Sequence, residues 1–200
     1  MIRRMVPLVA ILVATAGCGS PTAAVPTVAI ESPPSLPSGI KTEFVEYVRW
    51  AKFKPGTTMV KRTTTETKGH PLKTVEVVTS KLLELTDDRA IVETHLTGTR
   101  FDGIKMDTAP VKATISRYYY LQDNVKIKVP KKDKTEPVTV SNKTYQADVI
   151  SVKDRNEVGE VLTTLWTSDE VPGGLLKSES FLSDNGKLVT IELIELRAAQ

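Results

Sequence analysis

Few side chains of this sequence have the type and spacing that catalysis or metal binding requires. Cys18 is the single thiol, so neither an intramolecular disulfide nor a zinc site of several cysteines can form. The two histidines, His70 and His95, have no neighbouring His or Cys that would complete a metal-ligand set. The sequence also has no Gly-x-Ser-x-Gly elbow, no His-Glu-x-x-His helix and no P-loop. We therefore expect a protein that is not an enzyme and that has no catalytic residues, no metal and no cofactor.

The composition is ordinary for a globular chain. Of the 200 residues, 40% are apolar and 26% are charged, which excludes a disordered chain and a protein with many membrane spans. Lysine and arginine number 27 against 24 aspartates and glutamates. This excess is too small and too spread out for a nucleic-acid binder. The length fits one domain with tails.

The first eighteen residues have the pattern of an export signal. Two arginines precede a mostly apolar stretch over residues 6–16, which is too short to cross a bilayer as a helix. The stretch ends in Thr15-Ala16-Gly17-Cys18, and small residues directly before a lone cysteine resemble the lipobox of bacterial lipoproteins. The resemblance implies that the signal is cut before Cys18 and that Cys18 is lipidated. The sequence departs from the lipobox at Thr15, where the family usually has Leu.

Two other interpretations of this segment remain open. Cys18 could lie beside a conventional cleavage site and remain a free thiol, or the segment could stay uncut as an anchor. We favour lipidation because an unpaired thiol is disfavoured in an oxidising compartment, whereas a lipidated thiol is consumed. The protein is then expected in the cell envelope, lipid-anchored and facing the periplasm or the exterior. In the better-known sorting rule an Asp after the cysteine retains lipoproteins at the inner membrane, so Gly19 and Ser20 favour the outer membrane.

Proline divides the rest of the chain into a tether and a domain. Five of the twelve prolines lie between Gly19 and Gly39 (Pro21, Pro26, Pro33, Pro34 and Pro37), a density that denies helix and sheet hydrogen bonding. About twenty residues extended at ~3.1 Å each would hold a domain up to ~60 Å from the bilayer. We therefore divide the chain into a signal peptide over 1–17, a lipidated and Pro/Ser-rich tether over 18–39, and one domain over 40–200.

The domain is expected to begin with one short helix. Apolar residues recur at helical spacing over residues 42–53, after a capping-type threonine, and Pro55-Gly56 ends the pattern. We expect a helix of about ten residues. The residues expected to face the core are Phe44, Tyr47, Val48 and Ala51.

After Gly56 the sequence predicts an antiparallel sheet of about nine strands. Threonine and valine, which favour strands, are abundant. Turn signals recur along the chain. They are Asp87-Asp88, Ser141-Asn142-Lys143, Asp154-Arg155-Asn156, Pro172-Gly173-Gly174 and Asp184-Asn185-Gly186, and within the last Asn185-Gly186 is a two-residue hairpin signal. In the apolar stretch over residues 75–85, Val75, Val77, Leu83 and Leu85 all have odd numbers, which places them on one face of a regular strand. Spacing this short leaves no room for helical crossovers, so the sheet must be antiparallel and the fold mainly β.

One helix followed by a long antiparallel meander resembles the LolA/LolB-like fold of bacterial lipoproteins and lipoprotein carriers, in which a curved open sheet wraps a helix. A closer resemblance is to a set of uncharacterised lipoproteins. They pair an early Trp-x-x-Phe-Lys-Pro-Gly, here Trp50–Gly56, with a late Trp-x-Ser-Asp-Glu-Val-Pro-Gly-Gly-x-x-Lys, here Trp166–Lys177. The resemblance covers about residues 42–196 and implies an open half-barrel packed on the helix. Closed barrels and sandwiches share the strand pattern, so the sequence leaves them open.

Four aromatic residues are candidates for ligand contact or for packing: Trp50, Tyr118, Tyr120 and Trp166. Trp166 could form a recognition patch with Asp169 and Glu170, or it could plug the open sheet beside the Pro172-Gly173-Gly174 turn. Tyr118 and Tyr120 share a strand face and could bind a glycan or an acyl chain. We favour packing in each case, because large aromatic residues commonly close a sheet with their polar atoms at the rim.

Five lysines surround Pro130, namely Lys126, Lys128, Lys131, Lys132 and Lys134. Near an anionic membrane or wall polymer, each lysine could add about 1 kcal/mol of attraction. Asp133 and Glu136 dilute the charge, and lysines also protect sheet edges. A solvated hairpin tip is therefore the favoured interpretation.

Two tasks fit a non-catalytic envelope lipoprotein of this kind. The first is binding or carrying a lipid or a lipidated partner in a cleft between sheet and helix, as the LolA/LolB-like resemblance implies. The second is a structural or interaction role without a small-molecule ligand, since no polar residues converge in the sequence. A hydrolase is the least favoured alternative. The expected partners are the membrane and a hydrophobic ligand or an envelope protein, and not nucleic acid.

Cys18→Ser is expected to abolish membrane attachment and to leave the stability of the domain unchanged. About twenty Pro-rich residues separate Cys18 from the first expected core residue, Phe44, so the anchor can pass no strain to the core. Fractionation should find the variant soluble after export, or retained as an uncut precursor, and a thermal melt should match wild type. Retention in the membrane after proven cleavage would contradict the lipoprotein assignment, and a large fall in melting temperature would contradict the tether.

Overall fold

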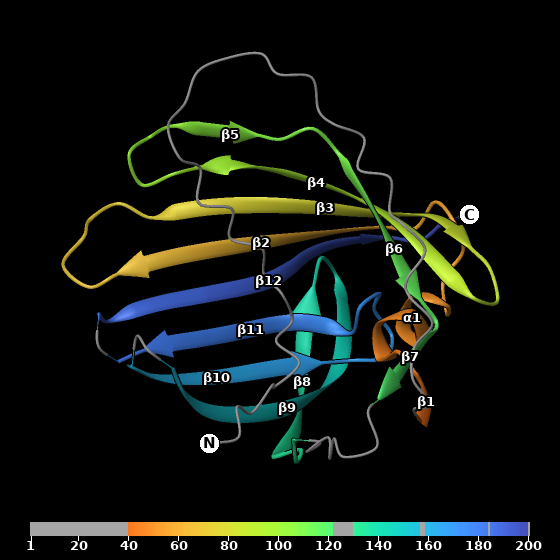
Figure 1. The fold of residues 1–200 in the computed structure, drawn as a ribbon. Coiled ribbons are helices and arrows are strands. Elements are labelled where there is room, and N and C mark those ends of the chain that lie inside the picture. The colour runs from red at the N-terminus through yellow and green to blue at the C-terminus, as the bar shows by residue number, and fades with distance from the viewer. Residues whose placement is uncertain (1–39, 122–129, 157–158, 184, 200) are drawn as a thin grey trace. The chain divides into compact units, whose positions relative to one another are not determined.

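Strands make up most of the chain in this computed structural model, which describes residues 40–121, 130–156, 159–183 and 185–199 (Figure 1). In chain order the elements are β1 (Ile40–Glu43), α1 (Val45–Trp50), β2 (Thr58–Thr67), β3 (Thr74–Leu85), β4 (Arg89–Thr99), β5 (Lys105–Asp107), β6 (Val111–Ser116), β7 (Tyr118–Leu121), β8 (Lys134–Val140), β9 (Lys143–Asn156), β10 (Gly159–Thr167), β11 (Leu175–Leu182) and β12 (Lys187–Arg197). No helix in these ranges is long and apolar enough to cross a membrane. Cys18, the tether, Lys126 and Lys128 lie outside the described residues.

Ten strands form one open antiparallel sheet in the order β5-β4-β3-β2-β12-β11-β10-β9-β8, with β6 also paired to β4 (Figure 1). Two meanders, one on each side, meet where β2 pairs with β12. The sheet does not close on itself. This confirms the predicted mainly β class with a large open antiparallel sheet and one short helix. The strand number was underestimated, because β1 and β7 form a separate two-stranded sheet and β5 and β6 are short.

The helix is shorter than predicted and buries a different face. Residues 40–43 form β1, so Thr42 lies in a strand, and the residue at the N-cap is Phe44. Tyr47 and Trp50, three residues apart, are buried, whereas Phe44, Val48 and Ala51 are exposed. The expectation for these last three residues was wrong. A helix of six residues has fewer than two turns, so one i, i+3 pair is enough to fill the face it presents to the sheet.

Register shifts place apolar residues three apart on the same side of two strands. One shift lies between Leu82 and Glu84 of β3, and another lies between Leu193 and Glu195 of β12. An extra residue at such a bulge reverses the alternation of side chains. Leu82 and Leu85 therefore both pack in the core, as do Leu193 and Leu196.

The bulge in β3 also ends the predicted parity of Val75, Val77, Leu83 and Leu85. Leu82 is fully buried, whereas Leu83 is only half-buried. Period-2 alternation holds within a regular strand, but a bulge depends on the partner strand and leaves no local signal. This part of the prediction was therefore wrong from Leu82 onward.

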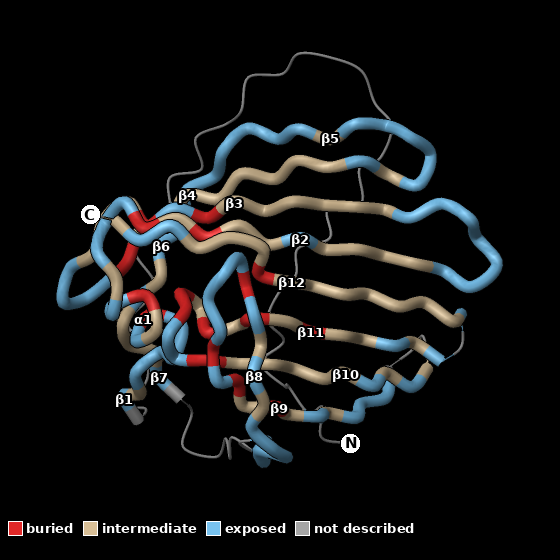
Figure 2. The backbone as a smooth tube through the Cα atoms, turned by 180° about the vertical axis from the view of Figure 1, so that it is seen from behind, coloured by how far each residue is buried: buried red, intermediate tan, exposed pale blue. Residues whose placement is uncertain are grey.

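Buried residues gather at one end of the sheet (Figure 2). The apolar cluster there contains Tyr47, Trp50, Met59, Leu82, Ala90, Val92, Val140, Tyr145, Ala147, Val171, Leu176 and Leu193. It joins α1 to the hairpin of β8 and β9, which folds back so that Ser141 Oγ donates to the Ile194 carbonyl at 2.8 Å. The other half of the sheet contains half-buried and exposed residues, except Ser178, which is buried. We call this half of the sheet the distal half.

Most of the predicted turns lie between strands. Asp87-Asp88 joins β3 to β4, and Ser141, with φ of 44°, begins the turn between β8 and β9. The Asn185-Gly186 hairpin joins β11 to β12, but its connection spans residues 183–186 rather than two residues. Asp154-Arg155-Asn156 was wrongly predicted as a turn. These residues pair with β10 within β9, because a strand end at the surface accepts polar side chains.

Leu82→Ala is expected to lower the free energy of unfolding by about 2–5 kcal/mol, since it leaves a cavity in the apolar cluster at the core end of the sheet. Leu83→Ala is the matched control, because this neighbouring leucine at the bulge is only half-buried. Urea unfolding of both variants measures the difference. Equal losses would contradict the assignment of Leu82 to the core and Leu83 to the bulge.

Candidate functional site

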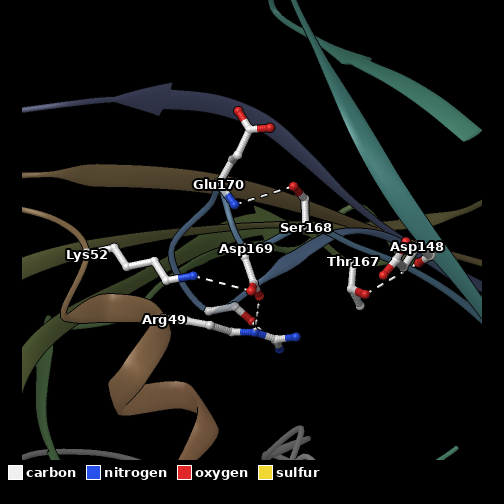
Figure 3. Close-up of polar contacts among 8 residues, drawn as sticks. Arg49, Lys52, Asp148, Thr167, Ser168, Asp169 and Glu170 are labelled. Atoms are coloured by element: carbon white, nitrogen blue, oxygen red, sulfur yellow. Dashed lines mark hydrogen bonds and ion pairs between the residues drawn. The ribbon is translucent and has the colours of Figure 1, made fainter. Parts of the chain in front are cut away.

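The two tryptophan motifs of the sequence lie side by side, and Arg49 joins them (Figure 3). Arg49 is the penultimate residue of α1, directly before Trp50. Its Nε lies 3.5 Å from Asp169 Oδ1, and its Nη1 donates to the Gly173 carbonyl at 3.4 Å. Lys52 Nζ lies 3.3 Å from the other oxygen of Asp169. Lys52 of the early motif and Arg49 directly before it thus supply two cations to the loop of the late motif.

Backbone hydrogen bonds and two left-handed glycines fix that loop. Ser168 N donates to the Gly174 carbonyl at 2.8 Å, and Gly174 N donates to the Val171 carbonyl at 3.0 Å. Gly173 and Gly174 have φ of 66° and 73°, which glycine adopts at no steric cost. Val171 and Pro172 are fully buried. The loop is therefore rigid and tied to the core.

Gly174 also lets Arg49 approach the backbone. A Cβ at Gly174 would lie 2.3 Å from Arg49 Cζ, so the guanidinium packs flat where a side chain would otherwise stand. Arg49 Nε is buried and donates no hydrogen bond to any described residue. The guanidinium is thus held by packing and by the carboxylate of Asp169 at ion-pair distance.

Arg49 borders a polar pocket of about 240 Å³. The pocket is lined by Arg49, Thr135, Gln146, Asp148, Thr167, Ser168 and Asp169. Hydrogen bonds from Lys132, whose Nζ lies 3.2 Å from Asp148 Oδ1, and from Thr135 at 3.0 Å lower the pKa of the Asp148 carboxyl. Thr167 Oγ1 donates to the Asp148 carbonyl at 3.4 Å (Figure 3). The Asp148 carboxyl is therefore ionised at neutral pH, and Lys132 neutralises its charge.

Lys61 of β2 lies close to this site. Burial lowers its pKa to about 8; the carboxylate of Glu46 opposes the shift, and the charge of Arg49 adds to it. Its Nζ is 4.0 Å from the position of a Cβ at Gly173. Three cations thus surround the loop that carries Asp169.

On five strands, β9, β10, β11, β12 and β2, one face of the distal half carries no charge across two adjacent rows of paired residues. The first row is Ile150, Leu165, Ser178, Ile191 and Thr63, and the second is Val152, Thr163, Ser180, Val189 and Thr65. We call these ten residues the uncharged face. On the opposite face the same strands carry ion pairs such as Arg62–Glu192 at 2.8 Å and Lys177–Glu179 at 2.7 Å. On β3 the next residue of the first row is Glu76, which pairs with Thr63.

The uncharged face is continuous with the polar pocket. Asp148 pairs with Thr167, and two residues further along the same strands Ile150 pairs with Leu165. Successive side chains on one side of a strand are two residues apart. The pocket is therefore the next row of the same face, towards α1.

The candidate aromatic residues do not form one site. Trp50 is 1% exposed in the core, and Trp166 packs against the same cluster while its Nε1 donates to Glu136. Tyr118 and Tyr120 lie on β7 in the two-stranded sheet, where Lys41 Nζ stands 3.8 Å from the ring centroid of Tyr118.

The described lysines of the Pro130 region are partly neutralised. Lys132 pairs with Asp148, and Lys134 Nζ lies 2.5 Å from Glu136 Oε2. Lys131 is exposed. Lys132 thus belongs to the surroundings of the polar pocket. Among the described residues, no three His, Cys, Asp or Glu side chains are placed to hold a metal ion.

Arg49 and Asp148 were not anticipated as site residues. Asp169 was named because it lies in the late motif, but its partner Arg49 precedes the early motif by one residue. Nothing local marks a contact between residues so far apart in sequence. The signal that was available is the pair of glycines after Pro172, since Gly174 is needed for the close approach of Arg49.

No protein family and no curated protein matches this sequence. Among solved structures, it is similar to a candidate lipoprotein from Parabacteroides distasonis, with 15% identity, a TM-score of 0.42, and coverage of 72% of this chain and 96% of that one. A candidate exported protein with a YmcC-like fold from Bacteroides fragilis has 8% identity, a TM-score of 0.43, and coverage of 72% and 97%. At these identities and TM-scores, neither likeness carries an argument about this chain.

Gly174→Ala is expected to cost more stability than Gly69→Ala. Both glycines have a similar positive φ, 73° and 79°, but a Cβ at Gly69 meets nothing within 4 Å. The φ alone costs about 1–2 kcal/mol in each variant, and at Gly174 the displacement of Arg49 adds to it. Urea unfolding measures both variants alone and in an Arg49→Ala background, where the extra cost at Gly174 should vanish. An extra cost that persists there would contradict the contact.

Proposed function

We propose that this protein is a membrane-anchored, non-catalytic envelope lipoprotein that binds a lipid or a lipidated partner on the uncharged face. The observation that carries the proposal is the two-row stretch of Ile, Leu, Val, Ser and Thr side chains without an ionisable group. Its five apolar members are half-buried and none is fully buried. Besides α1, β6 and β8, no labelled element lies across the sheet in either view (Figures 1 and 2).

The dimensions of this face suit an acyl chain. Strands lie about 4.8 Å apart, so a row across five strands spans about 19 Å, which is comparable to the length of a fatty acyl chain. Covering apolar surface with an apolar chain is favourable at about 25 cal/mol per Å². Two of the five hydroxyl side chains of the face, Thr163 and Ser180, hydrogen-bond each other at 3.0 Å between their oxygens, so this pair keeps its partner beneath a bound chain.

The binding surface proposed here differs from the cleft between helix and sheet that the sequence suggested. Trp50 and Leu82, which are 1% and 0% exposed, occupy the space between α1 and the sheet. A ligand there would have to displace core side chains. The distal half requires no such displacement.

The anchor part of the proposal rests on the sequence. The lipobox-like Thr15-Ala16-Gly17-Cys18 and the Pro-rich segment after it would tether the domain within ~60 Å of a membrane. A lipid source therefore lies within reach of the domain. The alternative role, a structural or interaction lipoprotein that uses the lysine loop, is less supported, because Lys132 and Lys134 already pair with acidic neighbours.

Native mass spectrometry of the full chain is expected to detect a non-covalently bound lipid in addition to any covalent lipid. The double variant Leu165→Gln/Ile191→Gln should lose most of the bound lipid, because it adds polar groups at the centre of the uncharged face. Thr164→Gln/Thr190→Gln is the matched control, since these residues lie on the same two strands and face the other side. Repeated preparations of wild type without bound lipid, or equal retention by both variants with wild-type melting temperatures, would contradict the proposal.

A further inference from the structure

We propose that the polar pocket at Arg49 binds an oxyanion, either a carboxylate or a phosphate group. The pocket of about 240 Å³ is lined by a guanidinium, three hydroxyl side chains and an amide, together with the carboxylates of Asp148 and Asp169. The Thr135 and Thr167 hydroxyls already donate to Asp148, so the remaining donors are the Arg49 guanidinium, the Ser168 hydroxyl and the Gln146 amide. These are the donors that recognise carboxylate and phosphate oxygens in proteins. Nothing in the proposed function assigns a role to this pocket.

Arg49 is preorganised for this role. Gly174 packs against its guanidinium, Gly173 accepts from Nη1 at the long distance of 3.4 Å, and Asp169 stands 3.5 Å from Nε. None of these contacts is a short hydrogen bond. The guanidinium is therefore fixed in position while its hydrogen-bonding capacity is largely unused, and a fixed donor loses little entropy when it binds an anion.

The charges around the pocket leave one cation in excess. Asp169 pairs with Lys52 at 3.3 Å, and Asp148 pairs with Lys132 at 3.2 Å. At the edge of the site, Glu170 pairs with Lys143 at 3.3 Å. Arg49 shares the single carboxylate of Asp169 with Lys52, so these two cations face one negative charge. The charge of Arg49 lowers the pKa of Lys61, and the carboxylate of Glu46 raises it.

The position of the pocket defines two sources for the oxyanion. Because Asp148 and Thr167 form the next row after Ile150 and Leu165, an amphiphile could place its chain on the uncharged face and its anionic head at Arg49. This source rests on the proposed function. A free oxyanion would bind at Arg49 without using the uncharged face at all.

Calorimetry of the full chain in nanodiscs, with empty nanodiscs subtracted, tests both sources with octanoate, octanol and inorganic phosphate as probes. We expect octanoate to bind at least about tenfold more tightly than octanol, because only octanoate makes a charge-assisted hydrogen bond. Arg49→Gln should remove this preference. Arg62→Gln is the matched control, since Arg62 is also an ion-paired arginine but lies on the opposite face of the sheet.

The outcomes separate the two proposals. Phosphate binding that depends on Arg49, without binding of either octyl probe, would support the oxyanion site and contradict lipid binding on the uncharged face. Equal binding of octanoate and octanol without phosphate binding would overturn the oxyanion site and leave the proposed function standing. Binding of no probe would overturn both.

A second measurement covers the case in which Arg49→Gln does not fold. In wild-type protein labelled with ¹⁵N-arginine, the Arg49 Nε–H resonance should shift on addition of octanoate or phosphate and should not shift on addition of octanol. The same shift with all three probes, or with none, would overturn the oxyanion site.

Discussion

The pairing of β2 with β12 is the constraint on which the rest of the domain depends. It joins the first and the last strand of the large sheet along ten pairs of residues, from Thr58–Arg197 to Thr67–Lys187. Both meanders beside it are local, whereas this pairing must close a loop of most of the domain and is slow to form for that reason. It places Met59 beside Leu196 at the core end, and Thr63 beside Ile191 on the uncharged face. Core and candidate ligand surface therefore form together.

The short helix connects that core to the polar pocket through two consecutive residues. Trp50 is buried in the apolar cluster, and Arg49 points to the loop of the late motif. A helix of six residues has no stability of its own, so its position is set by Trp50 and Tyr47. Tyr47 Oη donates to the Thr86 carbonyl at 2.6 Å, which ties the helix to the turn between β3 and β4. The accuracy with which Arg49 is placed thus depends on core packing.

Features with local causes could be predicted from the sequence, and features with distant causes could not. Pro172-Gly173-Gly174 was predicted as a turn with positive φ because glycine alone accepts that conformation readily, and both glycines have it. The antiparallel class followed from short strand spacing. The bulge at Leu82 depends on β4, and the contact of Arg49 with the late motif joins residues more than one hundred positions apart. Periodicity carries no information about either.

The two halves of the sheet differ in how deeply their apolar residues are buried. A sheet is stable when one of its faces is buried against a second layer. Among the described residues, α1 and the hairpin of β8 and β9 pack at one end of the sheet, whereas the five apolar residues of the uncharged face stay half-buried. An apolar ligand there would complete the second layer, so its binding free energy would add to the stability of the fold. The row after Ile150 and Leu165 contains Asp148 and Thr167, which line the pocket together with Arg49. The surface therefore changes from apolar to polar and charged within one row of residues. If an amphiphile binds as proposed, that change would give it one orientation on the sheet, with its polar head towards α1.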